Sequence, residues 1–560
     1  MASYLMNLTF QNRGYDHAFL NQLETGSASA MLDRDALCDA LFTLHEQQKR
    51  VVLITDFDMD GICCGVLGAC ALQELGFVWS LWPTQPADGY GFTADTVESL
   101  LCAFPDTAAI LTSDLGVQCF DGIQTAKDHG VSVYVTDHHK DRVDGTLPAA
   151  DLVVDPMRHG DPYEYPAICG AHVLWQVFDR YAKLHASVFA QEQIRRLRLF
   201  AGIGTVSDGM PFLHENRELI RDAVRIARLM FFDNHSFLVD RMLGSALYRN
   251  CFLAVHQLLS YFASDGKILE NKDINADFFA FYLAPMFNSV KRMNGDINRA
   301  FAVFFNGGQR DDITYLYELN QRRKELVAYH LDEMEQADQP YAPFIYESLA
   351  PAGILGLLAQ HKCAEMGMPV IVVNPEDSYK GSGRSPAWYP FLTRAGSHVT
   401  AAGHENAFGA FLESEFRMKE AADFLKQDVP SVMPEPSEQK RIYDFVIDVS
   451  GRDGDVGLDP VAFLEYLDDL RDYEPFGSGF PKPHLLLRIP KGMGIYGRIG
   501  SARTHLKIQL PLGVSVLLWN QADMLEEYRD RDELLIEGAM SLSWFQDNPS
   551  LSFTGEVCEP

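Results

Sequence analysis

Short apolar runs alternate with longer helical stretches in the first part of the chain. The apolar runs are VVLIT (51–55), AAILT (108–112), VSVYVT (131–136) and DLVV (151–154). The stretch that follows the first run, GICCGVLGACALQELG, has the composition of a buried helix. Strands that alternate with helices in this way form parallel β-α-β crossovers. The pattern predicts an α/β domain with a parallel sheet, which we place at residues 51–235.

The pattern changes again after this domain. Strand signals fade between about Ala171 and Lys324, and we expect the remainder of the first domain there, followed by a helical connector at residues 236–335. Apolar runs such as PVIVV (369–373) then return, which predicts a second, smaller α/β domain at residues 341–428.

The C-terminal part begins after a segment without apolar periodicity. This segment, VPSVMPEPSEQ (429–439), contains three prolines and is typical of a linker. Residues 481–521 form short alternating runs broken by glycines, which predict a small antiparallel β barrel or sheet. We assign residues 440–560 to this domain and residues 1–50 to a helical or irregular lead-in.

Composition limits the classes of protein to which the chain can belong. A chain of 560 residues with 47% hydrophobic and 22% charged residues is too long for one core and has the composition of a folded, multidomain protein. We expect a cytoplasmic protein without membrane partners, because no secretory signal and no uninterrupted apolar stretch of about 18 residues is present. The net charge of −30 opposes binding to a polyanion, so any such site must be local.

Acids and histidines follow the predicted strands or stand in adjoining loops. They are Asp56, Asp58 and Asp60 after VVLIT, Asp114 after AAILTS, Asp137, His138 and His139 after VSVYVT, and Asp208 after AGIGTVS. Ligands of open α/β sheets bind outside the carboxyl ends of the strands, so these groups should converge. Carboxylates with imidazole suit Mn²⁺ or Mg²⁺, and two such ions about 3.5–4 Å apart promote in-line attack on phosphorus.

Each motif also has a simpler explanation when it is taken alone. An Asp-x-Asp-x-Asp-Gly segment can be a helix N-cap or a lone calcium loop, and a His-His pair can be surface or core filler. Calcium is disfavoured because Gly61 opens a hydrophobic helix and no glutamate stands at the twelfth loop position. The joint placement of the motifs after consecutive predicted strands favours the metal site.

The acids and histidines lie in four motifs, ITDFDMDG (54–61), TSDLG (112–116), TDHHK (136–140) and GTVSDGMPF (204–212). These motifs resemble those of the DHH phosphoesterase superfamily, and within it the RecJ family of single-strand-specific exonucleases. The resemblance continues through DGYGF (88–92), ICGAHVLW (168–175), APMFNSVKRMNGDINRA (284–300), PAGILGLLAQ (351–360), GSGRS (381–385), AAGHENAFG (401–409), EPFGSGFPKP (474–483) and RTHLKI (503–508). It covers about residues 50–520 in the order of the family.

The resemblance implies a role for each motif residue. The metal ligands would be Asp58, Asp60, Asp114, His138 and Asp208, with Asp114 between the two ions. His139 would contact the scissile phosphate, and Asp56 and Asp137 would orient ligands. The substrate would be bound by Tyr90 of the Gly-Tyr-Gly segment, by Arg292, and by Ser382, Arg384 and His404 of the DHH-associated domain.

The chain departs from the family pattern at Gln85, where an arginine usually helps to hold the terminal 5′ phosphate. A neutral amide cannot replace a guanidinium fork, so we expect no strict dependence on a 5′ phosphate. The Gly-Gly-His motif also reads Ala402-Gly403-His404, which is a milder change.

The function that these observations favour is a metal-dependent exonuclease acting on single-stranded DNA from the 5′ end with two Mn²⁺ or Mg²⁺ ions. One alternative is a phosphoesterase for short oligonucleotides or signalling dinucleotides, which the net charge favours. Another is a catalytically silent scaffold that binds DNA or a replication protein. A single-strand-binding protein or a helicase is a further candidate partner.

Residues 481–521 hold six Lys and Arg residues and no acid. RecJ proteins carry an OB-like module at this position, and such modules combine a basic groove with aromatic faces for base stacking. We therefore predict that the incoming strand is held by Lys491, Arg498, Arg503 and Lys507. The alternative is that these cations pair with the acidic stretch 441–476 beside them.

Overall fold

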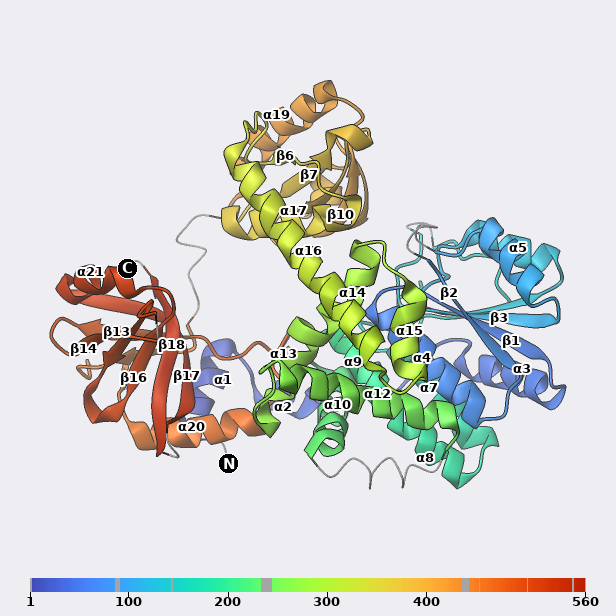
Figure 1. Ribbon diagram of the computed structural model, residues 1–560, viewed down its shortest axis with the longest axis horizontal. Helices are drawn as coiled ribbons and strands as arrows, with labels where there is room; N and C mark the ends of the chain where they lie inside the picture. Colours follow the sequence, from blue (N-terminus) through green and yellow to red (C-terminus); the bar gives the residue numbers. More distant parts are fainter. Residues whose placement is uncertain are drawn as a thin grey trace. The chain divides into compact units, whose positions relative to one another are not determined.

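The computed structural model describes residues 3–85, 91–142, 145–232, 244–434, 443–452, 454–500, 502–545 and 548–558. The chain divides into two compact units (Figure 1). The larger unit comprises residues 26–211 and 218–438, and the smaller comprises residues 1–25, 212–217 and 439–560. The division predicted from the sequence is finer than these two units and stays a prediction.

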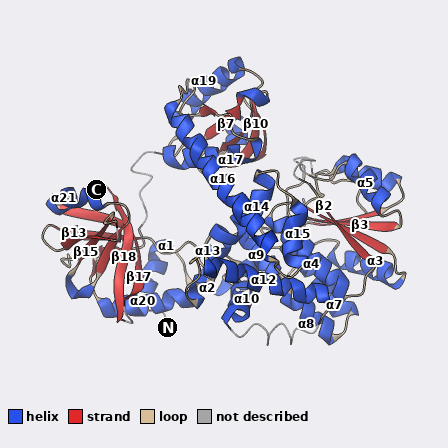
Figure 2. Ribbon diagram, viewed as in Figure 1, coloured by secondary structure: helices blue, strands red, loops and turns tan. Residues whose placement is uncertain are grey.

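A five-stranded parallel sheet forms the first part of the larger unit, with strand order β2-β1-β3-β4-β5 (Figure 2). The strands are β1 (Arg50–Thr55), β2 (Trp79–Pro83), β3 (Thr107–Ser113), β4 (Ser132–Thr136) and β5 (Leu152–Val154). Helices connect and flank them: α3 (Arg34–Glu46), α4 (Met59–Glu74), α5 (Ala94–Ala103) and α6 (Phe120–Asp128). The four predicted strands and the parallel sheet are confirmed, and β2 was not predicted.

Helices follow this sheet without a further strand, and one prediction is corrected here. They are α7 (Gly170–His185), α8 (Val188–Arg196), α9 (Arg198–Ser207) and α10 (His214–Phe232). The segment AGIGTVS, expected to be a strand end or an adjoining loop, lies in α9, and Asp208 is the C-cap of that helix. Leu199, Phe200, Ile203 and Val206 are buried at helical spacing, which explains why packing favours a helix despite two glycines.

The connector is helical, as predicted, over its described residues. Its elements are α12 (Ala246–Ser264), a 3₁₀ turn η2 (Asn271–Asp273), α13 (Ala276–Phe278), a π-helical turn η3 (Phe279–Leu283), α14 (Ala284–Arg292), α15 (Ile297–Phe305) and the long α16 (Arg310–Gln336). Helix α16 packs against α14 and α15 and then against α17. It therefore joins the connector to the second sheet (Figure 1).

The second sheet has strand order β6-β7-β8-β10-β9 and is antiparallel except for the β6–β7 pair. Its strands are β6 (Ile345–Glu347), β7 (Val370–Asn374), β8 (Lys380–Arg384), β9 (Thr400–His404) and β10 (Ala407–Phe411). The helices are α17 (Ala352–Met366), η4 (Pro375–Asp377), α18 (Phe391–Ala395) and α19 (Glu415–Val432). Helix α19 enters the segment predicted as a linker, because the buried Val429 belongs to this domain's core.

The smaller unit contains an eight-stranded sheet with order β12-β11-β13-β17-β18-β16-β15-β14. The strands are β11 (Val446–Asp448), β12 (Val456–Gly457), β13 (Leu485–Pro490), β14 (Ile495–Ile499), β15 (His505–Gln509), β16 (Ser515–Leu518), β17 (Glu533–Phe545) and β18 (Asn548–Cys558). Helices α20 (Pro460–Asp472) and α21 (Leu525–Asp530) and the 3₁₀ turns η5 (Pro511–Gly513) and η6 (Ala522–Met524) complete its C-terminal part.

The N-terminal helices α1 (Tyr4–Arg13) and α2 (His17–Gln22) belong to this same unit. Leu5, Met6 and Phe10 share a buried core with strands β13 and β15. The Arg13 guanidinium donates to both carboxylate oxygens of Asp444, and both side chains are nearly buried. The first 25 residues thus complete the C-terminal core, which the sequence pattern did not indicate. No helix in the described ranges is long and apolar enough to cross a membrane.

Candidate metal centre

The loop after β1 places three carboxylates at the start of α4. Asp58 is the N-cap of α4, and its Oδ1 accepts from the backbone N–H groups of Asp60 at 3.1 Å and Gly61 at 3.3 Å. Asp60 is buried, and its Oδ2 accepts from the Gly170 N–H at 2.7 Å. This capping explains why the Asp-x-Asp-x-Asp-Gly sequence stands at a strand-to-helix turn.

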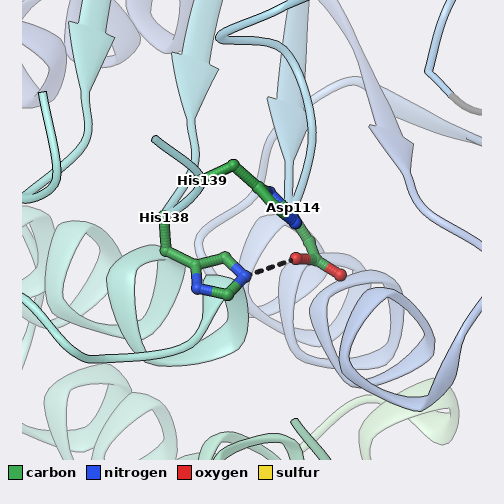
Figure 3. Close-up of side chains that lie close together, drawn as sticks. All are labelled: Asp114, His138 and His139. Atoms are coloured by element: carbon green, nitrogen blue, oxygen red, sulfur yellow. Dashed lines mark hydrogen bonds and ion pairs between the residues drawn. The ribbon is translucent and has the colours of Figure 1, made fainter. Parts of the chain in front are cut away.

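Asp114 and His138 come from the ends of the neighbouring strands β3 and β4. Asp114 adopts a left-handed backbone conformation with φ of 62°, and its N–H donates to the Thr136 carbonyl at 3.1 Å. His138 Nε2 lies 3.0 Å from Asp114 Oδ1 (Figure 3) and 3.7 Å from Asp208 Oδ2. The structure therefore brings groups from β3, β4 and the end of α9 to one place.

Asp137 fixes the two histidines. Its Oδ1 accepts from the His138 N–H at 2.7 Å and lies 2.8 Å from His139 Nδ1, and its Oδ2 accepts from the Val117 N–H at 2.9 Å. Burial opposes the charge of Asp137, but His139 and these hydrogen bonds lower its pKa to about 2. Burial likewise opposes the charge of His139, yet Asp137 raises its pKa to about 9. This pair therefore brings a protonated imidazole to the cluster near neutral pH.

The described residues include two sets of possible metal ligands that share Asp114, and within each set the ligand atoms lie within 4.8 Å of one another. They are Asp56, Asp58 and Asp114 in one set, and Asp114, His138 and His139 in the other. The shared position of Asp114 agrees with the bridging role that the resemblance implies. The sets differ from the predicted ligands, since they contain Asp56 and His139 rather than Asp60 and Asp208.

Glycines let the backbone approach these carboxylates closely. A Cβ on Gly204 of α9 would lie 2.2 Å from Asp60 Oδ1, and one on Gly170 would lie 2.6 Å from the Asp114 Cβ. A Cβ on Gly61 would lie 2.3 Å from the Asp56 carbonyl oxygen. The glycines of these motifs are thus required by packing around the acids.

The electrostatics of the cluster suit divalent cations. Burial raises the pKa of Asp56 to about 7 and that of Asp114 well above its usual range, and neighbouring carboxylates add to both shifts. Asp56 Oδ1 is buried and has no hydrogen-bond partner within the described ranges. Buried carboxylates that repel one another are stabilised by bound cations, and oxygen with imidazole ligands fits Mn²⁺ or Mg²⁺.

Lys291 of α14 is a residue of this site that the sequence reasoning missed. Its Nζ lies 3.7 Å from Asp56 Oδ2 and 3.6 Å from Asp58 Oδ2. Burial opposes the charge of Lys291, but the charges of Asp58 and Asp56 raise its pKa. Its position directly before Arg292, in a segment already noted for its resemblance, was the available signal.

The second sheet gathers the predicted phosphate-binding side chains on one face. Arg384 of β8 pairs with Ala407, which pairs on its other side with His404 of β9, so Arg384 and His404 stand in one cross-strand row. Ser382 is two residues from Arg384 on the same strand and shares that face. Tyr90 lies outside the described residues, so its place is not given.

The four predicted cations of the smaller unit do not share one face. Lys507 pairs with Gly497 and Leu517, whereas Arg498 pairs with the buried Leu506 and therefore points to the opposite side. Arg503 stands in the turn between β14 and β15, and Lys491 Nζ donates to the Asp530 carbonyl at 2.6 Å.

Lys507 has aromatic neighbours on its face. His505 lies two residues from it on β15, and the His505 and Trp519 rings are in edge contact at 4.9 Å between centroids. Among the other cations of 481–521, Arg488 Nη1 lies 3.5 Å from Asp448 Oδ2. For this residue the alternative, pairing with the acidic stretch 441–476, therefore holds.

Family models identify two parts of the chain. The model described as the DHH family, N-terminal domain, matches residues 50–201, and the RecJ OB domain matches residues 453–556. The chain is thus similar to the DHH family in one domain and to RecJ proteins in another. Curated relatives named single-stranded-DNA-specific exonuclease RecJ include that of Dickeya dadantii, 25% identical over 524 residues, covering 85% of this chain and 83% of that protein. That of Escherichia coli is 24% identical over 527 residues, covering 86% and 81%.

Solved structures agree with the RecJ-like fold. RecJ of Thermus thermophilus in complex with Mn²⁺ superposes with a TM-score of 0.75 at 20% identity, covering 100% of this chain and 76% of that one. The same protein in complex with Mg²⁺ gives a TM-score of 0.69 at 18% identity, covering 100% and 75%. At these identities the likeness shows the fold, and the predicted combination of α/β domains with a C-terminal OB-type domain is confirmed.

Proposed function

We propose that this protein is a metal-dependent exonuclease that hydrolyses single-stranded DNA from its 5′ end. The observation that carries the proposal is the pair of ligand sets that share Asp114 at the carboxyl ends of β3 and β4. It is supported by the RecJ-like architecture and by the exonuclease name of the curated relatives.

The residues of the metal centre have two roles in the proposed reaction: some would bind the metal ions, and His139 would act on the phosphate. Asp56, Asp58, Asp114 and His138 would hold two Mn²⁺ or Mg²⁺ ions, with Asp60 and Asp208 close by. When bound, such ions activate water and stabilise charge on phosphorus. His139, kept protonated by Asp137, places positive charge beside the cluster, where it can stabilise the phosphoryl oxygens.

The substrate would be held mainly by the second sheet. Arg384, Ser382 and His404 present a guanidinium, a hydroxyl and an imidazole from one sheet face, which is a suitable donor set for phosphate oxygens. Arg292 at the end of α14 would add a further guanidinium. In the smaller unit, Lys507 and Trp519 offer a cation and an exposed ring to the strand.

The remaining predictions about context stay proposals. They are the five-part division of the chain, a cytoplasmic location, and binding of a single-strand-binding protein or a helicase.

The test is an assay on end-labelled DNA with Mn²⁺. We expect single strands to be degraded to small products from the 5′ end and a blunt duplex of the same sequence to persist. Asp114→Asn is the matched control, because it keeps the size of a side chain common to both ligand sets. Cleavage of dinucleotides without degradation of long strands would favour the short-substrate phosphoesterase. Tight binding of single strands without any hydrolysis would favour the scaffold.

A further inference from the structure

Three half-buried arginines from three elements have no acidic partner among the residues that the structure describes. They are Arg292 at the end of α14, Arg323 on α16 and Arg384 on β8. Across the described parts of the chain, no carboxylate oxygen lies within 4.0 Å of any of these guanidinium groups. The chain has 77 acidic and only 47 basic residues, so a surface arginine has many potential partners. Three arginines together without one therefore require an explanation.

Helix α17 brings Arg292 and Arg384 close together. Gly353 packs directly on α14, since a Cβ there would lie 2.2 Å from the Arg292 carbonyl oxygen. Gly356, one turn later, faces β8, and a Cβ there would lie 3.0 Å from Arg384 Nη2 and from Ser382 Oγ. The two glycines lie three residues apart and so face the same side of α17. They let one helix face contact the Arg292 backbone and the Arg384 side chain.

Helix α16 presents Arg323 from the side that packs on these elements. Gly295, just after α14, contacts Leu319, to which a Cβ would come within 2.7 Å. One helical turn beyond Arg323, Leu326 and Val327 pack in the same apolar cluster as Ile354 of α17. Positions 319, 323, 326 and 327 share one face of a helix. Arg323 is therefore on the face that meets α14 and α17.

The Arg323 side chain is also held in place. Its Nε donates to Asn320 Oδ1 at 2.9 Å, and Asn320 is only 4% exposed. An amide on the preceding turn that binds Nε leaves the two terminal nitrogens of the guanidinium as donors to a ligand. This geometry orients the donors before any ligand binds.

The electrostatics of the three arginines favour binding of an anion. Burial, together with the charges of Arg323 and Arg384, lowers the pKa of Arg292 to about 10. Burial also lowers the pKa of Arg323 and of Arg384. Like charges held together away from water are costly without a counter-ion, and guanidinium forks match phosphate oxygens well.

We propose that Arg323 is a further phosphate-binding side chain, which with Arg292 and Arg384 forms a three-arginine pocket for one phosphate of the DNA strand. The proposal deepens the proposed function and rests on it. It supplies a guanidinium in a chain whose Gln85 stands where the family usually has an arginine. Arg323 would therefore contribute to substrate affinity without belonging to any of the motifs that indicate the family.

The test compares Arg323→Gln with Arg322→Gln. Arg322 is the matched control, because it is the adjacent residue, its side chain is 68% exposed, and it lies 3.9 Å from Glu318. The assay measures KM and kcat on single strands with a 5′ phosphate and with a 5′ hydroxyl. We expect Arg323→Gln to raise KM roughly tenfold, because a hydrogen bond to a charged group is lost, and Arg322→Gln to leave it unchanged. Asn320→Ala should raise KM by less than Arg323→Gln.

The two substrates identify which phosphate is bound. A rise confined to the 5′-phosphorylated strand assigns the pocket to the terminal phosphate, and an equal rise on both assigns it to an internal one. An unchanged KM on both substrates, with Arg384→Gln raising it, would refute the role of Arg323. Arg323→Lys distinguishes a lost phosphate contact from a folding defect. It keeps the positive charge, so it should recover part of the affinity for the substrate.

Binding of inorganic phosphate, measured by calorimetry, separates this proposal from the function itself. If the wild type hydrolyses no DNA, the proposed function fails, yet weaker phosphate binding by Arg323→Gln than by Arg322→Gln would still support the pocket. Equal phosphate binding by these two variants would count against it.

Discussion

Replacing Gly204 by alanine should disable the metal centre while leaving the fold intact. Gly204 lies in α9, where alanine would by itself favour the helix by about 1 kcal/mol. The added methyl would, however, lie 2.2 Å from Asp60 Oδ1 and 3.0 Å from the Ala171 Cβ. Asp60 is 2% exposed and accepts from the Gly170 N–H, so it cannot simply turn away.

The size of the effect follows from this geometry. Ordinary van der Waals contact begins near 3.4 Å, so Asp60 and the methyl must separate by about 1 Å more than the wild-type backbone allows. A displacement of about 1 Å in catalytic groups can reduce the rate on the order of 100-fold. We therefore expect a loss of about 100-fold in kcat/KM, with weaker Mn²⁺ binding.

The matched control is Gly68→Ala in α4. A Cβ there would lie 2.5 Å from Leu53 Cδ2, which is a side-chain methyl of the core rather than a group of the site. Overpacking of this kind costs about 1–3 kcal/mol of stability. Nuclease rates, Mn²⁺ titrations and melting curves of both variants distinguish damage to the metal centre from a loss of stability. Wild-type rates in Gly204→Ala, or an equal loss of activity in Gly68→Ala, would refute the reasoning.

Three further predictions concern the ions, the strand and the N-terminal helix. Chelation should abolish hydrolysis, and added Mn²⁺ should restore it in the wild type but not in Asp114→Asn. Lys507→Gln should weaken binding of long single strands and lower the salt dependence by roughly 0.7 log units per log salt, whereas Arg498→Gln, on the opposite face, should not; an equal effect of both would contradict the assignment. Arg13→Ala should lower stability by about 3 kcal/mol in urea unfolding, because Asp444 is left buried without its partner, and an unchanged midpoint would refute this.

Local patterns of the sequence predict the sheet and the acids well. Strands β1, β3, β4 and β5 have continuous apolar runs, because helices cover both faces of a parallel sheet. Asp114 and His138 could be placed together because consecutive parallel strands end at one edge. Strand β2 was missed, since all five of its residues are only partly buried and its sequence WSLWP lacks such a run.

Other features depend on contacts between distant segments, which no local pattern contains. Segment AGIGTVS was expected at a strand end or in an adjoining loop, but Gly202 and Gly204 allow a helix to pack closely against α10 and Asp60. Helix α1 shows little amphipathic character in its sequence, yet Leu5 and Phe10 complete a core more than 400 residues away. Lys291 and Arg323 were missed because their roles depend on side chains of other elements that lie beside them only in the folded protein.

The larger unit holds two clusters of like charge that have opposite sign to one another. The carboxylates around Asp114 repel one another, and the arginines at 292, 323 and 384 do the same, although the charge of Asp58 already acts on Arg292. Direct ion pairs between the clusters would be the stable solution for a protein without a ligand, yet among the described residues of α14 only Lys291 comes within ion-pair distance of the acids. A phosphodiester with divalent cations resolves both imbalances at once, since the acids bind the cations and the arginines bind the phosphate. This explains how a chain with a net charge of −30 can bind a polyanion locally.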